Sequence, residues 1–100
     1  QATNEKGTDE KEITLKIGSE IMLTPPMGWN SWNCWRFAAD DQKVRDAARI
    51  MHEKLQAYGW TYVNIDDGWE ADERTPEGEL PANEKFPDFK TLTDYIHSLG

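Results

Sequence analysis

The sequence contains very little cysteine and little basic charge. Cys34 is the only cysteine among 100 residues, so the chain can form neither an internal disulfide nor a multi-cysteine metal site. Against 11 basic residues stand 19 acidic ones, which gives a net charge of −8 without any cluster of Lys and Arg. Nucleic acids and anionic membranes attract basic surfaces, so neither is expected as a partner.

Long apolar runs are also missing. None approaches the roughly 20 residues of a membrane span, and the first residues lack the pattern of a signal peptide. Tryptophan, in contrast, is abundant. Of the 5 in the chain, four lie in or just beside two short stretches: Trp29, Trp32, Trp35 and Trp69. Such residues usually fill a core, but tryptophan beside polar residues at a strand end also suits a ligand-facing ring.

These two stretches, Met27–Asn33 and Asn64–Trp69, are the most informative part of the sequence. Each is a short apolar run that ends abruptly in tryptophan, amide or carboxylate side chains. Flat apolar faces contact a sugar ring, and fixed polar groups bind its hydroxyls. The pattern is therefore typical of strand ends that point into a sugar-binding cleft.

Between the two stretches, the sequence predicts an amphipathic helix. Apolar residues from Gln42 to Tyr58 recur at three- and four-residue spacing, with charged residues mostly on the other side. Asp40 or Asp41 can cap its first turn, and Gly59 can end it in a left-handed conformation.

The other predicted elements complete a β-α-β-α order. Strands are expected at Met27–Trp29 and Trp60–Ile65, irregular segments at Asn30–Ala39 and Asp66–Pro87, and a second helix capped by Asp88 and ended by Gly100. The segments leaving the strands are long, whereas the turn entering the second strand is tight. In parallel α/β folds the loops at the carboxyl ends of strands carry the site, so both stretches lie where a functional face is expected.

The first 22 residues follow a different pattern. Gln1–Glu12 is polar and predicts a loop, and Ile13–Ile17 alternates as a strand with one buried face. That strand has no neighbour to pair with, so residues 1–22 are interpreted as the tail of a preceding β module and a linker. They resemble the end of small immunoglobulin-like modules, in which a Lys-Gly-Thr turn leads into a final strand. Residues 23–100 form the second predicted domain.

Asp66 and Asp67 are the main candidates for chemistry. Neighbouring side chains on a strand point to opposite faces, so both can address one ligand only if the backbone turns, which Gly68 permits. A catalytic pair, a cation site, a loop cap and a set of hydroxyl acceptors all remain open. A catalytic pair must flank one glycosidic bond, which neighbours on one turn do poorly, so hydroxyl recognition is favoured. A cation site would take further oxygen ligands from Glu70, Asp72 and Glu73.

Four other reactive side chains have ordinary interpretations. His52 and His97 are predicted to be surface or packing residues of helices, far from the functional face. Cys34 has no base near it in the sequence and is predicted to be an unreactive thiol. Arg74 can reach a substrate oxygen or remain a solvated charge.

Five stretches then occur in a recognisable order: Thr24–Asn33, Tyr62–Trp69, Gly78–Leu80, Phe86–Pro87 and Tyr95–Gly100. Together they resemble the amino-terminal part of the glycoside hydrolase family 27 α-galactosidases, also called melibiases. The resemblance implies a (β/α)8 TIM barrel, an α/β fold of which this chain supplies the first two β/α units. It also implies a retaining enzyme that removes terminal α-linked galactose or α-N-acetylgalactosamine.

The resemblance assigns roles to three residues. Trp32 matches the tryptophan that walls the sugar pocket, and Asp66 and Asp67 match the carboxylates that bind the hydroxyls at carbons 4 and 6. The family's nucleophile and general acid/base are aspartates on later strands. No catalytic residue is therefore expected here, and the 100 residues alone are expected to hydrolyse nothing.

The family resemblance also has implications for the substrate, for cofactors and metals, and for the location of the enzyme. It implies an α-galactoside as substrate, no cofactor and no metal, and it favours a secreted or periplasmic location. One departure concerns Gly68, because many members have there a cysteine bonded to the loop after the first strand. Cys34 is therefore expected to be free and the first loop to be held by packing. A non-catalytic carbohydrate-binding module and a structural α/β module are the alternatives.

Overall fold

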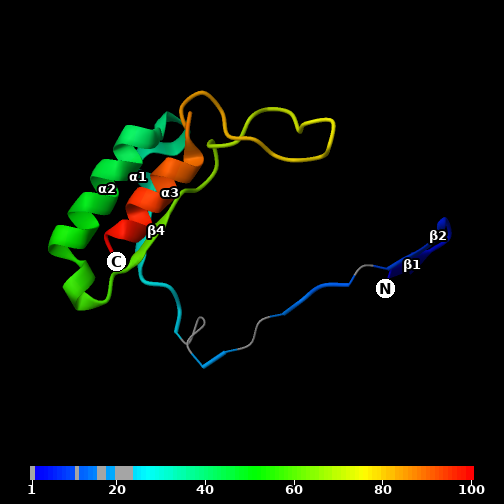
Figure 1. Ribbon diagram of the computed structural model, residues 1–100, viewed down its shortest axis with the longest axis horizontal. Coiled ribbons are helices and arrows are strands. Elements are labelled where there is room, and N and C mark those ends of the chain that lie inside the picture. The colour runs from blue at the N-terminus through cyan, green and yellow to red at the C-terminus, as the bar shows by residue number, and fades with distance from the viewer. Residues whose placement is uncertain (1, 11, 16–17, 20–23) are drawn as a thin grey trace.

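The computed structural model describes residues 2–10, 12–15, 18–19 and 24–100. Its strands are β1 (Ala2–Asn4), β2 (Gly7–Asp9), β3 (Gly28–Asn30) and β4 (Tyr62–Asn64). Its α-helices are α1 (Trp32–Trp35), α2 (Asp41–Lys54) and α3 (Phe89–Ser98), and its 3-10 helices are η1 (Arg36–Ala38) and η2 (Gln56–Tyr58). The hairpin β1–β2 lies apart from a body formed by the other elements (Figure 1). No helix in these ranges is long and apolar enough to cross a membrane.

The body is built on two parallel strands, as predicted. β3 pairs with β4 so that Trp29 is opposite Val63 and Asn30 is opposite Asn64. Gly28 permits this close pairing, because a Cβ at that position would lie 2.0 Å from the carbonyl oxygen of Tyr62. The predicted order strand, helix, strand, helix is therefore confirmed.

The core lies between the strands and the two longer helices, which pack side by side (Figure 1). Its fully buried residues are Ala39, Val44, Phe86 and Leu92. Partly buried residues from both strands, from the segment that follows β4 and from α3 pack against them: Trp29, Val63, Ile65, Trp69, Ala82, Phe89 and Ile96. Trp29 and Trp69 thus fill the core, which is the ordinary role of tryptophan.

Both helix caps form as predicted, but α2, which is the first of the two predicted helices, is shorter than expected. The Asp40 and Asp88 carboxylates accept the backbone N–H groups of Lys43 and Thr91 at 2.8 and 2.9 Å. α2 ends at Lys54, and the chain tightens into η2 before Gly59 turns at φ 90°. The predicted continuation to Tyr58 is wrong because the last turn has little to bury, and the Tyr58 side chain is 77% exposed.

The segment Asn30–Ala39 is more regular than predicted. It contains α1 and η1, joined at Arg36, whose φ of 47° and ψ of −132° lie outside the conformations that L-residues favour. The sequence pattern misses these elements because each is only a single turn, too short to show a helical period.

The amino-terminal predictions are wrong in two respects. Residues expected to form a loop contain the antiparallel hairpin β1–β2, whose strands are also joined by the hydroxyls of Thr3 and Thr8 at 2.9 Å. The strand predicted at Ile13–Ile17 is absent from residues 12–15, where Ile13 and Leu15 are 70% and 77% exposed and have no face to cover. Lys16 and Ile17 lie outside the described residues.

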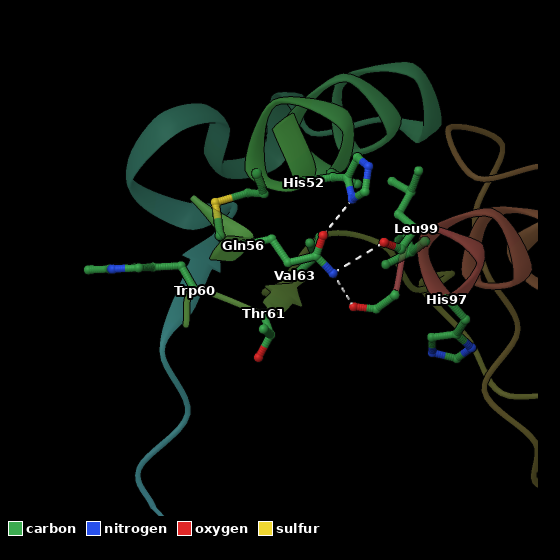
Figure 2. A pocket seen from close by; sticks show the side chains of 11 residues that line it. His52, Gln56, Trp60, Thr61, Val63, His97 and Leu99 are labelled. Atoms are coloured by element: carbon green, nitrogen blue, oxygen red, sulfur yellow. Dashed lines mark hydrogen bonds between the residues drawn. The ribbon is translucent and has the colours of Figure 1, made fainter. Parts of the chain in front are cut away.

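A hydrogen-bond network joins α2 and α3 at the amino-terminal end of the strands. Gln56 Oε1 accepts a hydrogen bond from His52 Nδ1 at 2.5 Å, and Gln56 Nε2 donates to the carbonyl oxygens of Leu99 and Gly100 (Figure 2). These residues line a shallow pocket together with His97. Both histidines therefore lie on helices away from the strand exits.

Candidate functional site

The two strand exits are joined by direct hydrogen bonds. Ser31 is fully buried, and its N–H donates to the carbonyl oxygen of Asn64 at 3.1 Å. Its Oγ in turn accepts the N–H of Asp66 at 2.9 Å. Asn30 adds a side-chain bond, with its Nδ2 donating to Asp66 Oδ2 at 2.9 Å. One serine and one asparagine thus fix the position of Asp66 relative to the first loop.

Two hydrogen bonds favour the ionised form of the Asp66 carboxyl group. Its Oδ1 accepts the N–H of Asp67 at 2.8 Å, while its Oδ2 accepts from Asn30. These two hydrogen bonds, the backbone one first, lower the pKa of Asp66 below its ordinary value. A half-buried, oriented carboxylate of this kind has lone pairs left to accept hydrogen bonds from a ligand.

Asp67 has a different electrostatic environment. The N–H of Gly68 is shared between Asp67 Oδ1 at 2.9 Å and Glu70 Oε2 at 3.2 Å, so the two carboxyl groups lie side by side. The hydrogen bond with the Glu70 carboxyl is the first cause that raises the pKa of Asp67, followed by desolvation. The same hydrogen bond lowers the pKa of Glu70. Asp67 is exposed and free to meet a ligand.

The loop that carries these carboxylates is braced from its other side. Asn83 Nδ2 donates to the carbonyl oxygens of Gly68 and Glu70 at 2.9 and 3.0 Å, and the N–H of Asn83 donates to the carbonyl oxygen of Trp69 at 2.8 Å. An isolated antiparallel bridge also joins Glu70 to Ala82. The segment after β4 is therefore held in place although it contains no regular element until α3.

Trp32 lies next to the same network. The backbone N–H of Trp32 donates to Asn30 Oδ1 at 2.9 Å, and Asn30 is the residue that binds Asp66. Trp32 is half-buried, and its ring forms a T-shaped pair with Phe37, with ring centroids 5.1 Å apart and planes at 83°. Trp35, by contrast, lies beneath the Nζ of Lys43, 5.5 Å from its ring centroid.

Trp32, Asp66 and Asp67, the three residues singled out from the sequence, thus belong to one hydrogen-bond network, in which Asn30 links the Trp32 backbone to the Asp66 carboxylate. Sequence reasoning missed the supporting roles of Asn30, Ser31, Glu70 and Asn83. Only Asn30 and Ser31 carried a signal, because both stand in the first strand-end stretch. The partners of Glu70 and Asn83 depend on how the second loop folds back, which no local pattern shows.

The other candidates do not join the site. Arg74 Nη1 donates to the carbonyl oxygen of Gly78 at 2.8 Å and so closes its own loop. Cys34 is free and exposed. Within the described part of the chain, no group of three or more His, Cys, Asp or Glu side chains is arranged to hold a metal ion. The alternative of a cation site with Glu70, Asp72 and Glu73 therefore finds no support.

Parallel strands whose carboxyl ends gather tryptophan, amide and carboxylate groups place the chain among the α/β proteins that carry their sites at this edge. Residues 24–100 match the sequence model of the melibiase family described as alpha galactosidase A. The chain belongs to this family, glycoside hydrolase family 27, and corresponds to the amino-terminal part of its catalytic domain.

Individual relatives support the assignment. The α-galactosidase of Coffea arabica is 41% identical over 97 residues, which are 94% of this chain and 26% of that protein. The crystal structure of α-galactosidase I from Mortierella vinacea has a TM-score of 0.78 at 40% identity, over 84% of this chain and 22% of that one. An α-galactosidase of Saccharomyces cerevisiae, solved with raffinose, has a TM-score of 0.71 at 35% identity, over 79% of this chain and 18% of that one. The chain thus spans about a quarter or less of the relatives it matches.

Proposed function

We propose that this chain forms the sugar-hydroxyl-binding part of a retaining glycoside hydrolase that removes terminal α-linked galactose. The observation that carries the proposal is the hydrogen-bonded junction of the two strand exits, in which Asn30 and Ser31 fix Asp66 beside Trp32. Family membership supplies the reaction class, and the raffinose complex of the yeast relative supplies a sugar of the expected kind.

In this proposal Asp66 and Asp67 accept hydrogen bonds from two hydroxyls of the sugar, and Trp32 covers an apolar side of the ring. Ionised carboxylates are strong acceptors, because charge-assisted hydrogen bonds are roughly twice as strong as neutral ones. The lowered pKa of Asp66 supports an acceptor role at neutral and mildly acidic pH. The hydroxyls at carbons 4 and 6 are the pair that the family pattern assigns to these residues.

The catalytic carboxylates belong elsewhere in the barrel. A retaining enzyme needs two carboxyl groups about 5 Å apart on opposite sides of one bond. Asp66 and Asp67 instead follow one another along a single turn and are engaged by Asn30 and Glu70. They therefore bind substrate, and the nucleophile and the acid/base come from later strands of the intact protein.

We also propose positions for the strands and helices within the barrel. We assign β3 with α2 and β4 with α3 to the first two β/α units of a (β/α)8 barrel, because the strands are parallel and both exits carry the site. The hairpin β1–β2 is assigned to a preceding β module, since it lies apart from the body (Figure 1). Residues 1–22 and 23–100 are then the two parts of the chain.

The test uses the intact protein that carries this chain. Asp66→Asn and Asp67→Asn are each expected to raise KM for an aryl α-galactoside at least about tenfold. A tenfold rise corresponds to about 1.4 kcal/mol, the energy expected when one charge-assisted hydrogen bond to the sugar is lost. Asp94→Asn is the matched control, because the Asp94 carboxylate pairs with Lys90 on the exposed face of α3. Galactose should also raise the melting temperature of the parent but not of Asp67→Asn.

Three results would contradict the proposal. Unchanged KM in both site variants would remove the carboxylates from the site. A melting temperature that responds to calcium but not to galactose would favour a structural, cation-stabilised module. Binding of galactose without any hydrolysis by the intact protein would favour a carbohydrate-binding module.

A further inference from the structure

Phe37 lies between the two loops of the candidate site. Its ring forms a T-shaped pair with the Trp32 ring, with centroids 5.1 Å apart. Phe37 also lies against Gly68, where an added Cβ would lie 3.0 Å from Phe37 Cδ1 and 3.4 Å from Phe37 Cα. One side chain therefore touches both the tryptophan of the first loop and the peptide that follows Asp67.

The position of Phe37 is enforced by its backbone. Arg36, just before it, has a φ of 47° and a ψ of −132°, and it is the one non-glycine residue of positive φ among the described residues. Such a conformation costs about 1–3 kcal/mol and persists only where the surrounding structure enforces it. Directly after the strained residue, the Phe37 carbonyl oxygen accepts from Lys85 Nζ at 2.8 Å. The second loop thus holds the residue that covers it.

Burial does not account for this arrangement. The Phe37 side chain is 61% exposed, so it contributes little to the core, whose buried members are other residues. Gly68 has a φ of 91° and no side chain, which lets the ring lie against its backbone. An exposed aromatic residue that directly follows a strained residue, and whose carbonyl oxygen is bound by Lys85, is better explained by what its side chain touches.

We propose that Phe37 is a positioning residue that rests against the Asp67 loop and holds the Trp32 side chain in its orientation, so that it acts on the sugar site through Trp32. This rests on the proposed function, since it concerns the same sugar site. Phe37 takes no part in bond making or breaking, so its loss weakens sugar binding and leaves the chemical step unchanged. An aromatic pair contributes about 0.5–1.5 kcal/mol, which corresponds to a change in KM of about 2- to 12-fold.

The test is a double-mutant cycle in the intact protein with an aryl α-galactoside. Phe37→Ala is expected to raise KM about 2- to 12-fold with unchanged kcat. In a Trp32→Ala background the same change is expected to have no further effect on KM, because the residue through which Phe37 acts is gone. Phe37→Tyr keeps the ring and is expected to retain the parent KM. Tyr58→Ala, which removes a 77% exposed aromatic side chain at the other end of α2, is the matched control and should also leave KM unchanged.

The outcomes separate this proposal from the one before it. If Trp32→Ala leaves KM unchanged, the sugar-facing role of Trp32 fails and the role of Phe37 fails with it. If Trp32→Ala raises KM but Phe37→Ala has the same effect in both backgrounds, or none, only the positioning role is overturned. Phe37→Leu covers the case in which the alanine variant does not fold: it keeps the apolar cover of Gly68 but loses the ring contact. Phe37→Leu should raise KM in the protein that keeps Trp32 but not in the Trp32→Ala variant. An unchanged KM in the protein that keeps Trp32 would overturn the proposal.

Discussion

Replacing Ser31 by alanine tests the junction on which the site depends. The substitution deletes one oxygen atom, the acceptor of the Asp66 N–H at 2.9 Å, and leaves the backbone bond from Ser31 to Asn64 in place. Because Ser31 is 0% exposed, water cannot replace the lost hydroxyl without rearrangement. A buried donor left without a partner costs about 1–3 kcal/mol, so we expect the free energy of unfolding to fall by that amount.

The same change should weaken substrate binding. If about 1.4 kcal/mol of the energy that orients Asp66 must then come from the substrate, KM rises about tenfold while kcat changes little. The assays are thermal unfolding, steady-state kinetics with an aryl α-galactoside, and hydrogen exchange of the Asp66 amide, which should become faster. A melting temperature lowered by at least about 2 °C is expected in a protein of barrel size.

The matched control is Ser98→Ala at the end of α3. Ser98 is exposed, and its Oγ donates to the carbonyl oxygen of Tyr95 at 2.6 Å, so the same chemical change is made where water can compensate. Its effect on the free energy of unfolding should stay within about 0.5 kcal/mol. If Ser31→Ala were no more destabilising than Ser98→Ala, with Asp66 amide exchange unchanged, the junction would not be held by Ser31 and the reasoning would be refuted.

Three further substitutions test other parts of the structure. Gly28→Ala places a Cβ 2.0 Å from the Tyr62 carbonyl oxygen, so it should destabilise the protein by at least about 3 kcal/mol in unfolding assays, and parent-like stability would contradict the strand register. Arg36→Gly relieves a φ of 47° and should raise the free energy of unfolding by about 1 kcal/mol; a loss of stability would contradict the strain. Glu70→Gln removes the first cause of the raised pKa of Asp67, so the pKa of Asp67 should fall. Substrate binding is expected to weaken when Asp67 takes up a proton, and in the variant this loss should occur at a lower pH. A KM against pH profile checks this, and an acid limb that does not move would remove Glu70 from the site.

The elements that the sequence predicts best are those with repeated signals. The helix α2 shows its apolar period over several turns and has a carboxylate cap and a terminal glycine. Its existence is confirmed, and it starts at Asp41, one residue before the predicted Gln42. The hairpin β1–β2 has only exposed, polar strands, and its pairing depends on a turn rather than on a buried face. The isolated strand predicted at Ile13–Ile17 shows the opposite error, because alternation alone does not provide a neighbour to pair with.

The site residues also divide into those with a local sequence signal and those whose roles depend on contacts between distant segments. Trp32, Asp66 and Asp67 could be chosen from the sequence because each ends an apolar run in a residue type that suits sugar recognition. Glu70, Asn83 and Phe37 could not, because their roles depend on contacts across the two loops. Phe37 lies against Gly68, 31 positions further along the chain, and directly follows Arg36, which adopts a conformation that its residue type does not favour. Strain of this kind has no signature in composition or periodicity.

The pairing of β3 with β4 explains why so few contacts suffice to assemble the site. In the observed register Asn30 is opposite Asn64, so Ser31 meets Asn64 and Asp66 without any adjustment of the loops. A slip by one residue would turn every side chain of β4 to the other face and separate the Ser31 hydroxyl from the Asp66 amide. Gly28 opposes such a slip from the other end of the strand, because only a residue without a side chain fits against the Tyr62 carbonyl oxygen. The glycine at the start of β3 therefore determines the position of the carboxylates beyond the end of β4.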